Sequence, residues 1–365
     1  MSNHPIPSSS LITAAGLLAF VFAGSAGAAV PNLGVDAALS LAKASPDTAC
    51  GSDDSRASTE TPENLCRSGT SSAVSGNGPW TWTCSDGRHT SKCSANEGAH
   101  YTYRTVDYPG SSLTIIWGLD DFGHVSGEYQ SGDTTSHAWT YRNGQFAALD
   151  PGGLFGGHFS AAGGPNDLGT LYGAYADASG LQHGFQVRWG NGETVDFAGH
   201  LNSNVDGINV FGAIAGVYWD SDGLYHGILR RNGRDIAVDA PGSRETYPLG
   251  IDSGGEIVGY WNTQPGVQRG FLRAANGRFS TIDVPLAGVT DTIVFAINDV
   301  GQVIGYYSDA NGDLHGFIEQ RGRFTYLDMP GAAFTIPTQI NNFGVIAGEY
   351  YDADFKVHGF VATPW

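Results

Sequence analysis

The sequence is poor in positive charge and in long apolar runs, and each shortage excludes a class of protein. Lysine and arginine together number 18 against 36 aspartates and glutamates, which gives a net charge of −18. Because nucleic acids and anionic lipids are bound through clustered lysine and arginine, we expect neither as a partner. Beyond residue 23 the chain has no apolar run long enough to cross a bilayer, so we expect no membrane span in the mature protein. The GxSxG, HExxH and P-loop signatures of common enzyme classes are also missing.

The N-terminal segment resembles an export signal, although its first ten residues contain no lysine or arginine. Residues 11–23 are apolar, a run too short to span a bilayer, and the small residues Ala-Gly-Ala follow at 26–28. We therefore predict a signal peptide over 1–28 and a spacer over 29–49. The missing basic residues leave a retained, uncleaved signal as the alternative. In either case we expect an extracellular, periplasmic or cell-surface protein.

All four cysteines lie in one segment, 50–98, at Cys50, Cys66, Cys84 and Cys93. An even number of cysteines behind an export signal predicts two disulfides, and the lack of a Cys-x-x-Cys pair argues against zinc. We favour Cys66–Cys84 and Cys50–Cys93, with the other two connectivities left open. Through its GPWTWTC core the segment resembles a small four-cysteine module of bacterial secreted and surface proteins.

From residue 99 to residue 365 the chain is a six-fold repeat. One landmark is a glycine after a polar turn, at Gly123, Gly169, Gly212, Gly255, Gly301 and Gly344. The second landmark follows the first by 14 residues in every copy, at His137, His183, His226, Arg269, His315 and His358. The copies are 46, 43, 43, 46 and 43 residues apart, a regularity that chance does not produce.

Each copy contains four short runs rich in Val, Ile, Phe and Tyr, separated by Gly, Asn and Asp. Four antiparallel strands at this period predict an all-β fold, a six-bladed β-propeller. The last copy lacks its fourth strand, whereas a lone fourth-strand segment, 101–110, precedes the first copy. We therefore predict that this N-terminal strand completes the last blade. An open β-solenoid of six repeats is the alternative.

Phrases of the form DxPG…IN…GYY.D..G..HGF recur along 99–365 and resemble the bacterial extracellular HAF-repeat family. His137, Ala138 and Trp139 come near the motif that names the family, while Arg269 and Ile228 depart from its HGF triplet. The resemblance implies a secreted or surface protein with a propeller-like repeat. It brings no catalytic residues with it.

Residues that recur in every copy are predicted to serve the architecture, since a reaction needs one constellation and not six. We expect each landmark histidine, and Arg269 in its place, to donate a hydrogen bond to a backbone carbonyl. Asp309, Asn311 and Asp313 have the D-x-N-x-D spacing of a calcium loop but lack its late bidentate carboxylate. A plain Asx turn is the favoured interpretation, and weak calcium binding, the sole cofactor considered, is the alternative.

Departures from the repeat are better candidates for a site. The spans from Asp150 to Gly169 and from Asp283 to Gly301 are longer than the other four, so two inter-blade loops carry insertions. Five residues on or near these loops fall outside the repeat consensus: His158, His200, Arg244, Glu245 and Asp291. They could line a polar binding site or an acid–base site.

Two glutamates occupy one repeat position. Glu128 and Glu349 stand in the first and last copies, which ring closure would make neighbours. Paired carboxylates can serve glycosidic chemistry, although second strands of adjacent blades are expected to keep them too far apart.

The sequence thus predicts an exported monomer that binds or scaffolds outside the cell, with a polysaccharide or another surface protein as its partner. A polysaccharide hydrolase or lyase that uses the inter-blade loops is one alternative. A purely structural envelope protein is the other.

Overall fold

The computed structural model describes residues 57–58, 66, 70–75, 80–85, 90–97, 100–132, 136–149, 159–188, 190–197, 202–219 and 221–365. Every regular element within these ranges is a β-strand. In this part of the chain no helix is long and apolar enough to cross a membrane. The predicted signal peptide and spacer lie outside the described residues.

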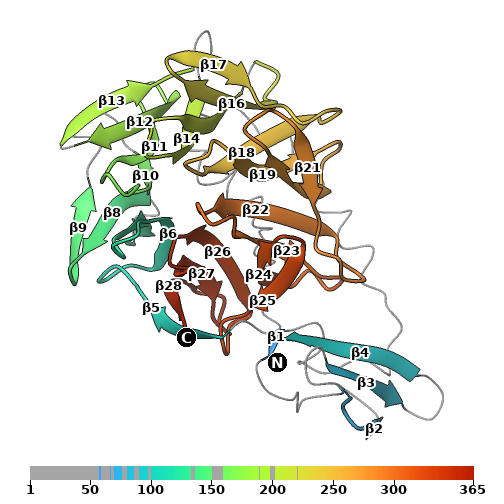
Figure 1. The fold of residues 1–365 in the computed structure, drawn as a ribbon. Coiled ribbons are helices and arrows are strands. Elements are labelled where there is room, and N and C mark those ends of the chain that lie inside the picture. Colours follow the sequence, from blue (N-terminus) through green and yellow to red (C-terminus); the bar gives the residue numbers. More distant parts are fainter. Residues whose placement is uncertain are drawn as a thin grey trace, which may run out of the picture.

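Six four-stranded antiparallel sheets are arranged as the blades of a ring, with their first strands innermost (Figure 1). The strands of blades one to three are β6 (Leu113–Leu119), β7 (Val125–Gln130), β8 (Ser136–Arg142), β9 (Gln145–Leu149), β10 (Phe159–Gly163), β11 (Leu171–Ala176), β12 (Gln182–Arg188), β13 (Asn191–Val195), β14 (Asn202–Ile208), β15 (Ile214–Trp219), β16 (Tyr225–Arg231) and β17 (Arg234–Ala237). Those of blades four to six are β18 (Glu245–Ile251), β19 (Ile257–Asn262), β20 (Gln268–Arg273), β21 (Phe279–Ile282), β22 (Asp291–Ile297), β23 (Val303–Ser308), β24 (Leu314–Gln320), β25 (Arg323–Leu327), β26 (Phe334–Ile340), β27 (Ile346–Tyr351), β28 (Val357–Pro364) and β5 (Tyr101–Thr105). The six-bladed propeller is confirmed.

The sixth blade joins the two ends of the repeat. β5 pairs with β28 in antiparallel register, from Thr105 opposite Phe360 to Tyr101 opposite Pro364. One residue beyond β5, the backbone N–H of Val106 donates to the carbonyl of Gly359 at 2.8 Å. The N-terminal strand therefore completes the last blade, as the sequence predicted, and the open solenoid is wrong.

A ring of side-chain hydrogen bonds links the first turn of each blade to the next blade. The Asn166 amide donates to the carbonyl of Asn209 at 3.3 Å, and Asn209 in turn donates to the carbonyl of Asp252 at 2.9 Å. The same bond runs from Asn298 to Asn341 at 2.9 Å. It then crosses the junction of the chain ends, because Asn341 donates to the carbonyl of Asp120 at 3.1 Å.

Two blades carry aspartate at this position, which has no amide to donate, and the following residue supplies the link there. In blade four the Ser253 hydroxyl donates to the Asp299 carboxylate at 2.8 Å. In blade one the backbone N–H of Asp121 donates to Asp167 at 2.9 Å. Every blade junction therefore has a polar contact around the channel. At four junctions that contact also satisfies a backbone carbonyl.

The four-cysteine segment forms a sheet of its own. It contains β1 (Ala57–Ser58), β2 (Thr70–Ser71), β3 (Trp80–Ser85) and β4 (Thr90–Glu97), in the order β1-β4-β3-β2. A disulfide joins Cys66 to Cys84, the pairing that the sequence favoured. Cys50 and the side chain of Cys93 lie outside the described residues.

Removing β5 tests the closure of the ring. A chain that starts at Ser111 leaves the outer edge of β28 unpaired and loses the burial of Val106. We expect it to be less stable than a chain starting at residue 99 by several kcal/mol, from about 2 kcal/mol for the valine and about 1 kcal/mol for each lost ladder bond. Urea unfolding of the two chains measures the difference, and equal midpoints would contradict closure by β5.

Candidate functional site

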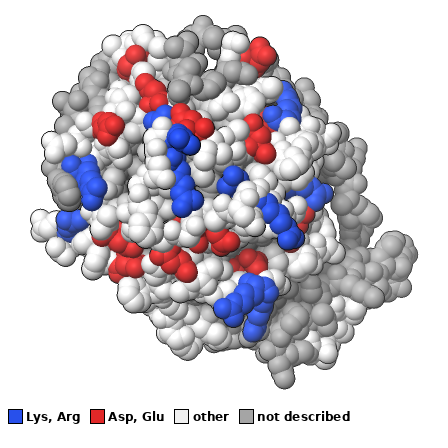
Figure 2. Space-filling view, turned by 45° about the horizontal axis from the view of Figure 1, so that its top comes forward, with Lys and Arg blue, Asp and Glu red and all other residues white. Residues whose placement is uncertain are grey.

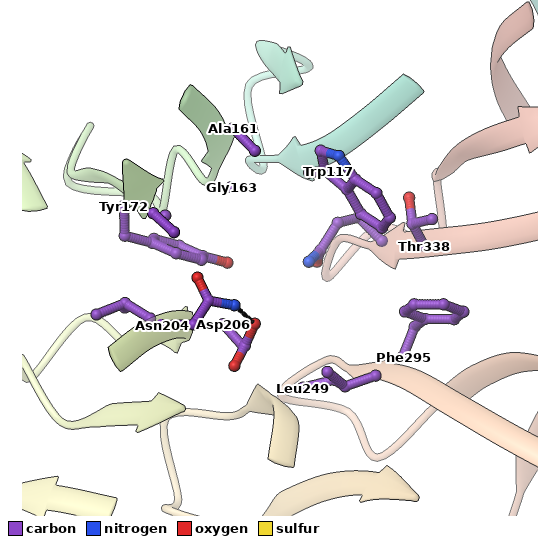
Figure 3. Close-up of a pocket in the computed structure, with 13 residues that line it drawn as sticks. Trp117, Ala161, Gly163, Tyr172, Asn204, Asp206, Leu249, Phe295 and Thr338 are labelled. Carbon is purple, nitrogen blue, oxygen red and sulfur yellow. Dashed lines mark hydrogen bonds between the residues drawn. The ribbon is translucent and has the colours of Figure 1, made fainter. Parts of the chain in front are cut away.

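A cavity in the central channel is built from β-bulges of the innermost strands. In five of the six blades the register of the first strand shifts by one residue, for example between Ile116 and Gly118. The residues left unpaired by these bulges are Trp117, Asp206, Leu249, Phe295 and Thr338. All five line the cavity, because a bulge redirects the extra side chain (Figure 3).

Blade two supplies space in place of a side chain. Its residue at the bulge position is Gly163, and the ring of Tyr172 lies against that glycine. The resulting cavity has a volume of about 60 Å³. That volume is room for a few water molecules or for one edge of a larger ligand.

One wall of the cavity is apolar and the opposite wall is polar. Trp117 and Phe295 lie with ring centroids 6.3 Å apart and planes inclined at 44°, beside Leu249. Across the cavity the amide of Asn204 donates to the carboxyl of Asp206 (Figure 3). Asn204 Oδ1 and Asp206 Oδ2 are buried and have no hydrogen-bond partner in the structure. Such buried, unpartnered atoms cost stability unless a ligand or water satisfies them.

Burial sets the protonation of the polar wall. It raises the pKa of Asp206 well above its usual range, which favours the neutral carboxyl. A neutral Asp206 both donates and accepts, so the Asn204–Asp206 pair can bind hydroxyl groups in either sense. Burial likewise raises the pKa of the neighbouring Tyr172, which stays a phenol.

Glu128 and Glu349 are buried on β7 and β27, in adjacent blades. Burial raises the pKa of Glu128 to about 7, against the lowering effects of the Trp117 indole and the Ser136 hydroxyl. That indole N–H lies close enough to act on the carboxyl but does not reach hydrogen-bonding geometry. Burial, and then the charge of Glu128, raise the pKa of Glu349 to about 8. Neither glutamate lines the cavity, so neither is placed to contact a ligand there.

The candidates taken from the long loops do not converge on the cavity. Glu245, at the start of β18, accepts a hydrogen bond from the Asn262 amide at 2.9 Å. Asp291, at the start of β22, accepts the backbone N–H of Gln268 at 2.8 Å, and burial raises its pKa. Arg244 is exposed. His158 and His200 lie outside the described residues.

The landmark histidines bind carboxylates and not the backbone carbonyls predicted from sequence. Their Nδ1 atoms face the aspartate of the DxPG phrase, at 2.9 Å for His183 and Asp196, 3.1 Å for His315 and Asp328, and 2.8 Å for His358 and Asp107. His226 faces Asp239 at 3.4 Å, and Arg269 donates to Asp283 at 2.6 Å. The signal was present in the sequence, since the aspartate recurs in every copy and the landmark position holds His or Arg in every copy. Among the described residues, no group of three or more His, Cys, Asp or Glu is placed to hold a metal ion.

The D-x-N-x-D loop forms an Asx turn in the structure. Asp309 Oδ1 accepts the backbone N–H groups of Asn311 at 2.8 Å and of Asp313 at 2.9 Å. Its Oδ2 accepts the amide of Asn311 at 3.1 Å. Both carboxylate oxygens of Asp309 are thus already engaged within the loop. In the equivalent turns Oδ1 of Asp177 and Oδ1 of Asp352 accept the same two backbone N–H groups. Calcium binding by this loop stays a prediction.

No protein-family model and no curated protein matches the sequence. Among solved structures, the putative TolB from Agrobacterium tumefaciens is similar at a TM-score of 0.47 and 12% identity, over 69% of this chain and 91% of that one. The Aleuria aurantia lectin, described as a six-bladed propeller with a novel fucose recognition mode, has a TM-score of 0.38 and 10% identity, over 69% and 87%. A putative gluconolactonase has a TM-score of 0.45 and 12% identity, over 72% and 92%. At these values the similarities carry no argument about function.

The buried carboxyl of Glu349 should make the protein less stable as pH rises. The carboxyl titrates near 4.5 when unperturbed and near 8 in the folded state, so the folded protein holds this proton more tightly. Stability is therefore lost as pH rises from about 4.5 through about 8. In urea unfolding, the Glu349→Gln variant should be more stable than the wild-type protein by a few kcal/mol at pH 9. At pH 5 the two proteins should have nearly the same free energy of unfolding.

The matched control for Glu349→Gln is Glu193→Gln, at an exposed position on β13. It should follow the wild-type pH dependence. The account of Glu349 is wrong if the wild-type protein and the Glu349 variant lose stability in parallel between pH 5 and pH 9.

Removing one landmark side chain should be costly only where it is buried. His315 is buried, and although burial lowers its pKa, Asp328 and Asp309 raise it to about 10. His315→Ala leaves these two carboxylates without their cation, so we expect a loss of about 3 kcal/mol at pH 7. Arg269→Ala breaks the exposed pair with Asp283 and should cost under about 1 kcal/mol. Urea midpoints measure both, and equal losses would contradict the assignment.

Proposed function

We propose that this protein is an exported glycan-binding propeller and that the channel cavity receives one edge of a sugar unit. The observation that carries the proposal is the cavity's division into an aromatic wall and a polar wall with two unpartnered buried oxygens. Aromatic faces pack against the C–H face of a sugar, and amide and carboxyl groups bind its hydroxyls.

The charge of the cavity favours a neutral ligand. Its described lining contains no lysine, arginine or histidine, so nothing there would compensate an anionic group. A neutral Asp206 likewise gains nothing from a cation. On the face drawn in Figure 2, acidic and basic side chains are interspersed and form no continuous basic patch. A neutral polysaccharide satisfies these conditions, whereas a polyanion does not.

Binding is favoured over catalysis because of what contacts the ligand space. Glu128 and Glu349 have the raised pKa of general acids, but they do not line the cavity. Glu245 and Asp291 are engaged by neighbouring groups away from it. A general acid must reach the bond it protonates, so a hydrolase or lyase is the less supported alternative.

Export through residues 1–28 and membership in the HAF-repeat family belong to the same proposal. Both are supported by the sequence patterns alone. N-terminal sequencing of the exported protein should find Ala29 as its first residue.

Substitution of the cavity walls tests the proposal. The full chain is first screened against neutral bacterial and plant polysaccharides for retention and for release of soluble products. With a retained glycan, Trp117→Ala and Asn204→Ala should each weaken binding about tenfold or more, as loss of a central contact does. Isothermal titration calorimetry measures the affinities.

The control is Trp365→Ala, which removes an exposed tryptophan that does not line the cavity. Asp206→Asn serves as a variant of nearly unchanged shape and should also weaken binding. Affinity that is unchanged in the cavity variants would place the site elsewhere. Release of products by the wild-type protein would replace binding with catalysis.

A further inference from the structure

In five of the six blades the turn between the first and second strands carries an exposed apolar residue at its tip. Blade four is the exception, with Gly254 at this position. The five residues, which we call the tip ring, are Phe122, Leu168, Phe211, Val300 and Phe343. The three phenylalanines are between 71% and 81% exposed, so they contribute little to the packing of the fold itself. Exposed apolar side chains gathered on one face of a protein are a feature of interaction surfaces.

The fold does not require these apolar side chains. Each turn is held by the Asx residue two positions earlier, as when Asp120 Oδ1 accepts the backbone N–H of Phe122 at 2.9 Å. It is completed by the glycine that follows at positive φ, Gly123 in this blade. Polar residues serve such turns well, and blade four makes the same turn without any side chain at the tip. The fold therefore gives no reason for the apolar side chains of the tip ring.

The tip ring surrounds one mouth of the channel. The six turns lie on the same face because every blade runs in the same direction around the ring. Between them is a cavity of about 100 Å³ lined by the Asx residues of the turns. The lining also includes four aspartates of these turns, which we call the acidic mouth: Asp121, Asp167, Asp252 and Asp299.

The acidic mouth has no compensating cation. Its described lining contains no lysine, arginine or histidine, and its carboxylates accept hydrogen bonds only from neutral groups such as the Asn342 amide. Burial raises the pKa of Asp167, and the charges of Asp121, Asp120 and Asp299 raise it further. The mouth therefore attracts a positive charge.

We propose that this face docks a cationic protein segment, in which a lysine or arginine enters the acidic mouth and flanking apolar side chains cover the tip ring. Charge complementarity selects this occupant. A second copy would bring two acidic mouths together, and an anionic membrane would be repelled in the same way. The proposal does not rest on the glycan cavity, which lies deeper in the channel and shares only Tyr172 and Gln339 with the described lining of the mouth.

A defined peptide tests the docking proposal on the full chain. The probe is a fluorescent peptide, Gly-Ser-Leu-Lys-Leu-Ser-Gly, compared with versions that carry Glu or Gln in place of Lys. We expect the lysine peptide to bind at least about tenfold more tightly than the glutamate peptide, and its binding to weaken as salt is added. Fluorescence anisotropy measures the affinities.

The double variant Phe122→Ser with Phe343→Ser should weaken binding of the lysine peptide about tenfold. The control is Phe355→Ser, which removes an exposed phenylalanine from the turn between β27 and β28, on the opposite face. It should leave the affinity unchanged. Neither substitution touches a residue of the glycan cavity.

Several results would overturn the proposal. One is no binding of the lysine peptide up to about 1 mM, the weak limit of specific recognition. Another is equal binding of the three peptides, or binding that survives the double variant. Self-association that is abolished by the double variant would assign the tip ring to a second copy. Binding to phosphatidylcholine vesicles that the same variant abolishes would assign it to a membrane.

Discussion

The pairing of β5 with β28 is the contact on which the rest of the structure depends. It brings blade six against blade one, and only then can Asn341 donate to the carbonyl of Asp120 and complete the polar links around the channel. Each link is a hydrogen bond of about 1 kcal/mol, too little to hold two blades alone. Closure makes them cooperative, since no blade can leave without breaking both of its junctions. It also removes the exposed edges that an open array of sheets would present.

Closure also explains why some repeat positions serve the architecture in every blade while others are free to form a site. The asparagine or aspartate of the first turn and the pairs of His or Arg with aspartate recur because every blade needs the same contacts. The bulge position faces the channel, where no contact between blades requires the same side chain in every copy. The residues at this position, such as Trp117, Asp206 and Phe295, can therefore differ from blade to blade. The tip ring shows the reverse pattern, because its apolar residues recur although no joint requires them. Recurrence without a structural need is the reason to assign that face to a partner.

The blades and the role of β5 could be predicted because they depend on local patterns: four apolar runs per copy, turn residues at fixed offsets, and a missing last strand. The cavity could not. A bulge depends on the pairing register of two strands, and the residues it exposes, such as Leu249, read in the sequence as ordinary core positions. The carboxylate partner of His183 was within reach, because Asp196 follows at a spacing that other copies share. Glu245 and Asp291 were selected because they depart from the repeat, and such a departure marks a loop as readily as a site.

Native-state hydrogen exchange of β5 tests the central claim, ring closure, most directly. The backbone N–H of Val106, which bonds to Gly359, and the β5 amides that bond to β28 should exchange as slowly as those of β26 and β27, through global unfolding. Equal exchange free energies in the three strands would establish that the N-terminal strand is part of the cooperative ring. Exchange of β5 at the rate of a frayed terminus, while β26 and β27 stay protected, would contradict the account.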